Sequence, residues 1–414
     1  LVAGASLSLI TPLVAQASDV NIEEMNSYSR SSKSSKKRFD SKTFSNELAN
    51  ANERVDGIES KLNAFEAGGF SDTTVLDGKV IFDVGSVDTD DDKYVGETQF
   101  MYTYTMNLNT SFTGDDNLYT RIKTGSHTSW SKTKSVYNTY LSSGNGNGDK
   151  LKVDKLWYTT PIGDSNHTLT IGPKIENYYM HATTPSIYKP ILKAFTLGGN
   201  AAAYGASTSP GGGWAYKADN GFAISSNFTS QQGKGDPHGL INDQSPTSWA
   251  TQIGYTQPQY SASAIINLKY NGWADSYFKT NDGSARPGDG SSTNIGLRGW
   301  WRPESTGTAT PSISVGYDTS ETDAAGNSNT TAYFVGLTWQ DTINADDRIG
   351  IAFGQPQKHE DDTVDPFLYE IYYDYPVNDS ITVTPAFFGG KSKHGSTGKE
   401  VDMTGYVLNT TFKF

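Results

Sequence analysis

The chain has 414 residues, including 42 glycines, 24 tyrosines and 18 phenylalanines, with no cysteine and a formal net charge of -12. That charge argues against nucleic acid as a partner, since neutralising phosphates needs a basic surface. The mean hydropathy of -0.54 argues against a helical membrane protein, because beyond the N-terminus no apolar run approaches the roughly 20 residues of a spanning helix. Glycine, threonine, serine, asparagine and aromatic residues instead favour many strands joined by turns.

The N-terminal residues predict export. Residues 1–17 form part of a signal peptide, in which an apolar run ends in Ala15-Gln16-Ala17, an A-x-A cleavage site. Residues 18–43 are polar and rich in serine, with a basic run over residues 29–38, and we expect a disordered spacer. A weak electrostatic contact of residues 29–38 with acidic cell-wall polymer is the alternative to a purely solvated spacer.

Residues 44–67 carry the apolar spacing of a coiled coil. The seam has alternating steps of four and three residues and runs through Phe44, Leu48, Ala51, Val55, Ile58, Leu62 and Phe65. An isolated helix of this length is marginal in water, so the seam predicts partner helices. We expect a periplasmic coiled coil through which subunits associate, with Leu48, Val55, Ile58, Leu62 and Phe65 at its seam. A helix packed on the mouth of a barrel is the alternative.

The period changes to two in residues 72–414. Apolar and polar residues alternate there, which is typical of half-buried strands. Short turns, as at residues 114–116 and 219–221, alternate with longer loops, as at residues 231–246 and 281–292. This pattern is typical of outer-membrane barrels. It predicts an all-β fold, a transmembrane antiparallel β-barrel of about 16 strands with a lumen wide enough for water.

The last strand has one apolar face and is expected to close the barrel. Its outward residues are Tyr406, Leu408, Phe412 and Phe414, at steps of two. Aromatic residues near the end of a strand suit the boundary between lipid and water.

Residues 176–210 interrupt the alternation and contain Pro185 and Pro190. A connection of roughly 30 residues inside a compact domain is either functional or disordered, and its aromatic and apolar content argues against disorder. We expect a constriction loop that folds into the barrel, with Glu176, Tyr178, Tyr179, His181, Tyr188, Lys189 and Lys193 as its functional residues. The alternative is an outer loop that packs between subunits.

Charged residues on the inward face are expected to set the ion preference of the pore. With the apolar face outward, the candidates are Arg121, Lys123, Lys269, Arg298, Arg302, Glu370 and Asp374. The basic residues would face Glu370 and Asp374 and create a transverse field. The alternative for each residue is an ordinary solvated wall position. In the strand at residues 151–160 the facing stays open, because either choice exposes a charge.

No motif indicates catalysis or a cofactor. The six histidines lack metal-ligand spacing, and no nucleophile elbow or phosphate-binding loop is present. We therefore expect a protein that is not an enzyme and needs no cofactor or metal. A barrel enzyme such as a lipase is an alternative that hydrolysis of membrane lipid would reveal.

Several blocks resemble cyanobacterial outer-membrane porins of the carbohydrate-selective (OprB-like) porin family. They are residues 55–84, 107–125, 169–175, 349–357, 377–387 and 410–414. The resemblance implies a homotrimer in outer-membrane lipid that passes small hydrophilic solutes and inorganic ions by passive diffusion; some members are associated with iron uptake. Relatives typically carry a surface-layer-homology domain before the coiled coil, and residues 18–41 are too short for one. Neither wall anchoring nor sugar specificity is therefore carried over.

The sequence thus predicts a porin of a Gram-negative type of outer membrane, with its N-terminal segment in the periplasm. A structural alternative remains open. In it, the barrel is largely plugged and the protein tethers the outer membrane to the cell wall.

Overall fold

The computed structural model of the protein describes residues 73–132, 136–199, 202–205, 208–231, 239–240, 245–273, 290–323, 329–394 and 397–414. The predicted signal peptide, spacer and coiled coil lie outside these residues, with Leu48, Val55, Ile58, Leu62 and Phe65, and they remain predictions. Within the described part of the chain, no helix is long and apolar enough to cross a membrane.

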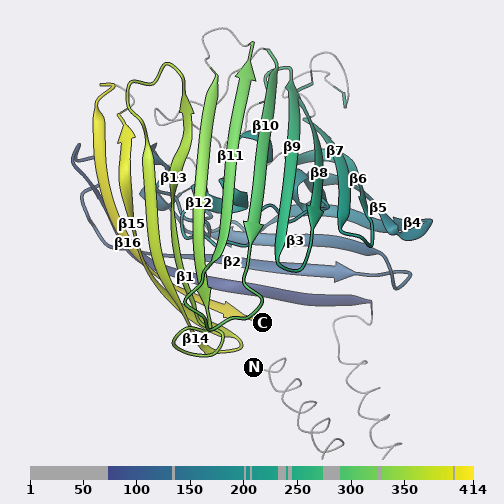
Figure 1. Cartoon of the computed structure of the whole chain (residues 1–414), viewed down its shortest axis with the longest axis horizontal. Helices are drawn as coiled ribbons and strands as arrows, with labels where there is room; N and C mark the ends of the chain where they lie inside the picture. The colour runs from purple at the N-terminus through teal and green to yellow at the C-terminus, as the bar shows by residue number, and fades with distance from the viewer. Residues whose placement is uncertain are drawn as a thin grey trace, which may run out of the picture. The chain divides into compact units, whose positions relative to one another are not determined.

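Sixteen antiparallel strands form a closed barrel (Figure 1). Each strand pairs with its neighbours in the sequence, and β1 (Thr74–Thr89) pairs with β16 (Glu400–Lys413). Closure pairs the backbone of every strand without water, which is the condition for crossing a bilayer with strands. The predicted fold class and strand number are confirmed.

The remaining strands follow the chain in order. They are β2 (Gln99–Thr110), β3 (Asn117–Gly125), β4 (Lys152–Ile162), β5 (Asp164–Glu176), β6 (Thr208–Lys217), β7 (Phe222–Ser230), β8 (Thr247–Thr256), β9 (Tyr260–Tyr270), β10 (Ser292–Trp301), β11 (Ser312–Thr322), β12 (Thr330–Gln340), β13 (Arg348–His359), β14 (Phe367–Asn378) and β15 (Ile381–Lys393). The short 3₁₀ helices are η1 (Ser129–Ser131), η2 (Val136–Asn138), η3 (Asn177–Met180), η4 (Lys193–Gly198) and η5 (Ala202–Tyr204).

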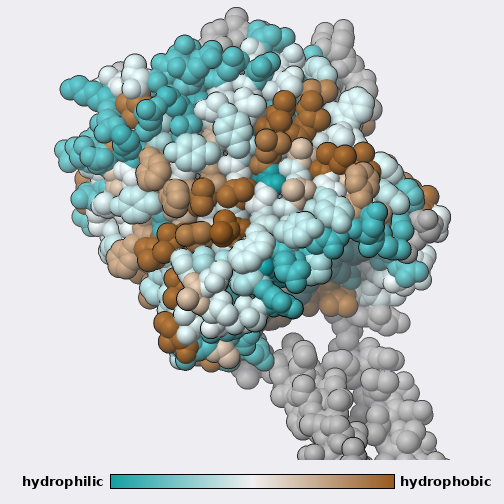
Figure 2. Space-filling view, viewed as in Figure 1, coloured by the Kyte–Doolittle hydropathy of each residue, from teal (hydrophilic) through white to brown (hydrophobic). Residues whose placement is uncertain are grey.

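Side chains alternate between lipid and lumen along the strands, as the period of two predicts. In β10, Ile295 and Leu297 are 40% and 51% exposed, whereas Asn294 and Arg298 are 0% and 4% exposed. Figure 2 shows apolar side chains gathered across the outer surface of the barrel. The exposed apolar rows therefore form the lipid-facing surface.

The closing strand β16 has the predicted outward face. Tyr406 and Leu408 are exposed, Val407 between them is buried, and the Phe412 ring lies 5.3 Å from the ring of Phe82 in β1. Phe414 follows the last residue of β16 and is also exposed. Pairing of β16 with β1 and β15 closes the barrel through this strand.

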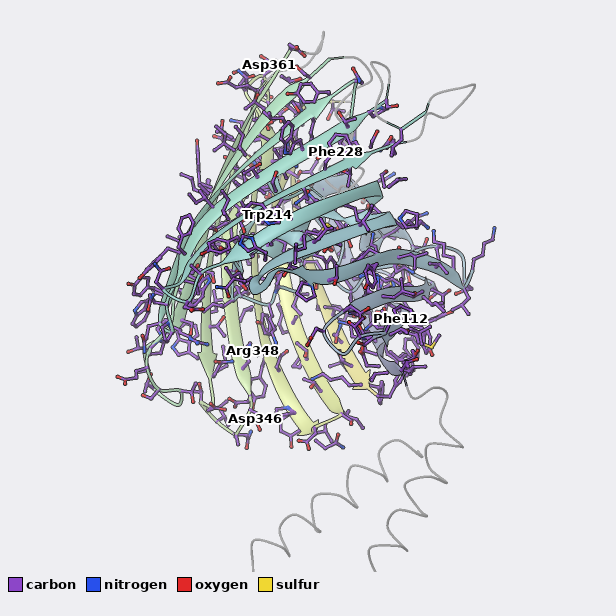
Figure 3. All side chains as sticks on the ribbon, turned by 90° about the vertical axis from the view of Figure 1, so that its right-hand side faces the viewer. Phe112, Trp214, Phe228, Asp346, Arg348 and Asp361 are labelled. Atoms are coloured by element: carbon purple, nitrogen blue, oxygen red, sulfur yellow. The ribbon has the colours of Figure 1, made fainter. Side chains whose placement is uncertain are left out.

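Connections alternate in length between the two ends of the barrel. Residues 163, 218–221, 257–259 and 379–380 lie at the short-turn end, while residues 126–151, 177–207, 231–246 and 271–291 belong to the long-loop end. Asp346 in the β12–β13 turn and Asp361 in the β13–β14 loop mark these opposite ends in Figure 3. In the β12–β13 turn the Asp347 carboxylate accepts three hydrogen bonds, from the backbone N–H groups of Thr342, Ile343 and Asn344. These N–H groups have no partner in a neighbouring strand among the described residues.

The largest apolar core lies inside the barrel. Inward residues of β12–β16 pack with apolar residues of the β3–β4 and β5–β6 connections; they include Phe334, Ala352, Leu368, Tyr372, Ala386, Phe388, Met403 and Val407. These strands therefore have two apolar faces, one toward lipid and one toward chain that has folded into the lumen. Smaller apolar clusters include Ala250 and Ile265 on β8 and β9 and Trp157 and Ile175 on β4 and β5.

Candidate functional site: a constriction made by two infolded segments

The β5–β6 connection, residues 177–207, lies against the inner wall of the barrel over its described residues 177–199 and 202–205. We call it the second infolded segment. The Gln252 side chain in β8 donates to the Thr183 carbonyl oxygen at 3.0 Å, and Trp300 in β10 donates to the Thr184 carbonyl oxygen at 3.0 Å. Asn267 in β9 donates to the Ala203 carbonyl oxygen at 3.2 Å. Polar side chains of the wall thus donate hydrogen bonds to backbone carbonyl groups of a segment that is not part of a strand.

Glycines on the inward face allow this segment to approach the wall. A Cβ atom at Gly316 in β11 would collide with the Gly198 carbonyl oxygen. At Gly336 in β12, a Cβ atom would lie 2.7 Å from Cγ of Tyr188. Any larger residue at these positions would push the segment away from the wall.

Two of the predicted pore cations lie beneath the second infolded segment. The Lys269 ammonium is buried and donates to the Ala202 carbonyl oxygen at 2.7 Å. The Arg298 guanidinium donates to the Leu197 carbonyl oxygen at 2.7 Å, pairs with Asp318 at 2.8 Å and lies 4.7 Å from the centre of the Tyr204 ring. Both side chains therefore contact the segment rather than open space.

Glu370 in β14 also binds the second infolded segment. Its carboxylate accepts hydrogen bonds from the Tyr188 hydroxyl at 2.9 Å and from the backbone N–H groups of Ile191 and Leu192 at 3.0 and 2.7 Å. The side chain is 1% exposed. Bonds to a buried carboxylate are among the stronger hydrogen bonds in proteins, so Glu370 fixes the position of the segment.

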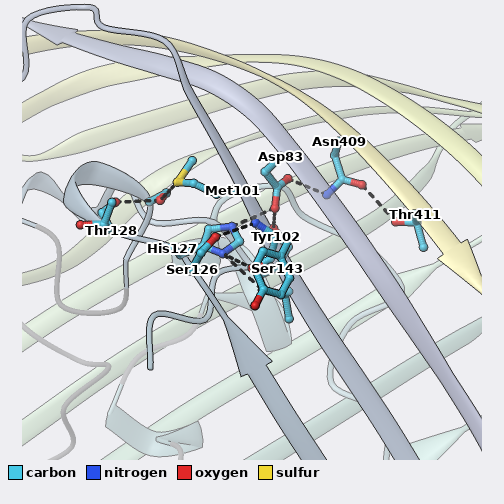
Figure 4. Close-up of polar contacts among 11 residues, drawn as sticks. Asp83, Met101, Tyr102, Ser126, His127, Thr128, Ser143, Asn409 and Thr411 are labelled. Atoms are coloured by element: carbon cyan, nitrogen blue, oxygen red, sulfur yellow. Dashed lines mark hydrogen bonds and ion pairs between the residues drawn. The ribbon is translucent and has the colours of Figure 1, made fainter. Parts of the chain in front are cut away.

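The β3–β4 connection, residues 126–151, also folds inward, which the sequence did not indicate. We call it the first infolded segment; the structure describes it except for residues 133–135. His127 and Ser143 both contact the Asp83 carboxylate of β1 at 2.9 Å, and Asn409 of β16 donates to the same carboxylate at 2.9 Å (Figure 4). On the other side, the Trp130 ring lies 5.9 Å from the ring of Phe388 in β15.

The two infolded segments pair with each other. Leu141 and Leu192 form an isolated antiparallel bridge, and the backbone N–H of Ser142 donates to the Ile191 carbonyl oxygen at 2.7 Å. The backbone N–H of Lys193 donates to the Tyr140 carbonyl oxygen at 3.0 Å. The paired segments, which we call the crossbar, are bound to the wall at Asp83 on β1 and at Glu370 on β14.

A cavity of about 370 Å³ remains between the crossbar and β1–β5. We call it the constriction cavity. Its wall residues are Lys79, Ile81, Thr103, Thr105, Asn107, Tyr119, Arg121, Lys123, Asp154 and Glu176, and the crossbar adds Tyr140, Ser142, Ser143, Gly144, Asn145, Tyr178, Tyr179 and Lys193. The predicted residues Arg121, Lys123, Glu176, Tyr178, Tyr179 and Lys193 therefore meet here, together with Lys79 and Asp154.

Carboxylates at this cavity are paired with cations. Arg121 binds Asp154 through a short ion pair and lies 3.6 Å from Glu176, and Lys155 lies 3.3 Å from Glu176. The pairing of β3 with β4 shifts register opposite Asp154, which is the extra residue of a bulge. Because a bulge disturbs the alternation, Asp154 and its neighbour Lys155 both reach the lumen side. This resolves the facing that the sequence left open in the strand at residues 151–160.

The rings of Tyr119, Tyr178 and Tyr179 line one side of the constriction cavity, and the Trp157 ring packs against Tyr119 and Tyr179. The Tyr119 and Trp157 rings lie 4.6 Å apart, Trp157 and Tyr179 lie 5.2 Å apart, and Tyr178 and Tyr179 lie 4.9 Å apart. The Arg121 guanidinium donates to the Tyr179 hydroxyl at 3.0 Å. The rings therefore support the charged side chains as well as the wall.

The remaining predicted residues lie elsewhere. His181 lines a smaller cavity of about 130 Å³ beside Trp157 and Trp214. Repulsion from Arg348, followed by burial, lowers the pKa of Lys189 in the second infolded segment. Asp374 pairs with Arg348 at 2.9 Å, and Arg302 donates to the Pro258 carbonyl oxygen at the short-turn end.

The structure contains no group of three or more His, Cys, Asp or Glu side chains suited to a metal ion among the residues it describes. Around the constriction cavity the structure places charged, hydrogen-bonding and aromatic side chains.

The barrel is similar to solved porins. Pseudomonas putida OprB at high pH matches with a TM-score of 0.59 and 12% identity, over 83% of this chain and 94% of that chain. A mutant porin of Rh. blastica matches with a TM-score of 0.51 and 9% identity, over 82% and 100% of the two chains. OmpT of Vibrio cholerae, in its trimer form, matches with a TM-score of 0.51 and 12% identity, over 83% and 99%.

A closed barrel of sixteen strands with a constriction of infolded segments defines a porin. A family model described as "Carbohydrate-selective porin, OprB family" matches residues 41–388, and the chain belongs to this family. Uncharacterized proteins of the cyanobacteria Nostoc sp. and Synechocystis sp. are 25% and 26% identical to it over 90% of this chain, covering 70% and 74% of those proteins. The protein is an outer-membrane channel for passive diffusion of solutes, and its family and fold are those of channels rather than enzymes.

Proposed function

We propose that solutes cross the barrel through the constriction cavity and that its charges favour anions. The crossbar contacts inward side chains from Ser225 in β7 to Phe388 in β15 and also Asp83 in β1. Residues of β1–β5 form the wall of the cavity that remains, which we take as the open path. Of the ionisable lysine, arginine, aspartate and glutamate side chains at the cavity, four are basic and two are acidic. Rings of basic side chains favour anions in pores. This excess of two positive charges is the observation that supports the proposal.

The ion preference is tested by the reversal potential of single channels in a gradient of potassium chloride. We expect chloride to permeate faster than potassium in the unchanged protein. Lys123→Glu cancels the excess of two charges, and two charges at ~6 Å in water change the energy of an ion by about 1.4 kcal/mol, a tenfold effect on permeability. The anion preference should therefore be largely lost.

Lys399 in the β15–β16 loop is exposed and does not line the constriction cavity. Lys399→Glu makes the same charge change and serves as the matched control, which should leave the reversal potential nearly unchanged. A cation-selective unchanged protein, or equal effects of the two substitutions, would contradict the proposal.

The structural alternative has one observation in its favour, which is the apolar core inside the lumen. If that core and the crossbar close the path, the barrel would serve as a tether between membrane and wall through residues 18–67. The same bilayer recording separates the two functions, because a correctly folded tether would not conduct.

The assembly proposed for this channel is a homotrimer with its N-terminal segment in the periplasm. The trimer form of Vibrio cholerae OmpT supports the assembly at the level of the fold, and the heptad seam of residues 44–67 supports it at the level of the sequence. Native mass spectrometry in mild detergent should give a mass of three chains. Deleting residues 44–67 should weaken the assembly, and a monomer of the intact chain would contradict it.

A further inference from the structure

We propose that the constriction cavity holds a binding site for a small tetrahedral oxyanion such as phosphate or sulfate. Lys79, Lys123 and Lys193 would bind it. The inference rests on the proposed function only in taking this cavity as the solute path. It adds a discrete, saturable site to a general preference for anions.

The first support is a pair of cations with no protein anion to neutralise them. Lys79 in β1 and Lys123 in β3 both line the cavity, and the ammonium group of neither forms an ion pair or a hydrogen bond with any residue that the structure describes. Lys123 is within electrostatic range of the cations Arg121 and Lys193 and of the carboxylates Asp154 and Glu176. Several positive charges around one small polar space repel each other unless an anion enters.

The carboxylates of the cavity do not supply that anion. Asp154 is bound to Arg121, and Glu176 lies 3.3 Å from Lys155 and 3.6 Å from Arg121. Because these two carboxylates are already neutralised by Arg121 and Lys155, the charges of Lys79 and Lys123 are left over. The charges of Lys79 and Lys123 match that of a divalent anion, and Lys193, which also lines the cavity, adds a third ammonium group.

The second support is a hydrogen-bond donor that lacks an acceptor. The side-chain amide nitrogen of Asn145, a residue that lines the cavity, is buried with no hydrogen-bond partner among the described residues. Leaving a buried donor unpaired is costly. An oxyanion has several acceptor oxygens and can bind this amide and the lysine ammonium groups at the same time, whereas a chloride ion offers a single centre.

The test uses the full-length channel in a planar bilayer that carries a chloride current. Phosphate or sulfate, added at constant ionic strength, should reduce the current and reach saturation, whereas glucose should not. Lys123→Gln removes one charge-assisted contact and should raise the half-blocking concentration about tenfold. Lys123→Arg should restore block to within about twofold of the unchanged protein, since it keeps the charge. Lys399→Gln is the control outside the cavity.

A second readout does not depend on conduction. Isothermal titration calorimetry of the detergent-solubilised protein with phosphate should give saturable binding that Lys123→Gln weakens. If the channel is anion-selective but phosphate at constant ionic strength causes no saturable block, the oxyanion site is contradicted and the proposed function is not. A silent channel that still binds phosphate through Lys123 would overturn the proposed path and leave the site standing.

Discussion

Replacing Glu370 with alanine is expected to release the crossbar from β14 and increase the conductance of single channels. The substitution removes the acceptor of three hydrogen bonds, from the Tyr188 hydroxyl and from the N–H groups of Ile191 and Leu192. Even at about 1 kcal/mol each, their loss weakens attachment by about 3 kcal/mol, a change of more than a hundredfold in the detached population. Recordings should show larger and noisier currents than the unchanged channel.

Glu304 in the β10–β11 turn is exposed and provides the matched control. Glu304→Ala should leave the conductance unchanged. Glu370→Gln keeps one acceptor oxygen but loses the charge, so its effect should lie between those of the unchanged protein and Glu370→Ala. Unchanged conductance of correctly folded Glu370→Ala would show that this carboxylate does not hold the constriction.

Arg298→Ala is expected to destabilise the folded barrel more than the other substitutions considered above. It removes the ion pair with Asp318 and the hydrogen bond to the Leu197 carbonyl oxygen, and it leaves the Asp318 carboxylate buried without its cation. Breaking a buried ion pair from one side costs roughly 3 to 5 kcal/mol. Urea unfolding of the barrel in detergent or lipid, followed by tryptophan fluorescence, should show this loss.

A double substitution separates the cost of the unpaired carboxylate from that of lost packing. Arg298→Met with Asp318→Leu removes both charges and should recover much of the stability that Arg298→Ala loses. Arg302→Ala, at the short-turn end, should have little effect, because Arg302 is exposed. If the double variant is as unstable as Arg298→Ala, the uncompensated charge is not the cause.

The period of the sequence determined the barrel because each strand carries its own signal. In β10, apolar residues such as Ile295 and Leu297 alternate with polar ones because one face of the strand meets lipid and the other does not. This alternation does not depend on which part of the chain lies on the opposite side of the lumen. Closure then follows from the number of strands and the lack of a tolerable free edge in a membrane. For this reason the fold class and the strand number could be predicted. The infolded β5–β6 connection was predicted from the break in the alternation at residues 176–210 and from its aromatic and apolar content.

A further signal was present in the sequence but was not used. Glycines recur at inward positions of neighbouring strands, at Gly254, Gly296, Gly316 and Gly336, and each faces an atom of the second infolded segment. A run of small residues along one wall marks where another part of the chain approaches closely. Large inward apolar residues mark such contacts too: Phe334 in β12 packs against the second infolded segment and Phe388 in β15 against the first.

Which charges line the open path was decided only by the tertiary structure. The sequence placed Arg121, Lys269, Arg298 and Glu370 alike on the inward face, yet Arg121 lines the constriction cavity and the other three lie against the crossbar. Local periodicity determines which way a side chain points, whereas what covers it depends on segments far away in the chain. The contact between Asp83 and His127 and the bridge between Leu141 and Leu192 are such long-range pairings, and together they position the constriction.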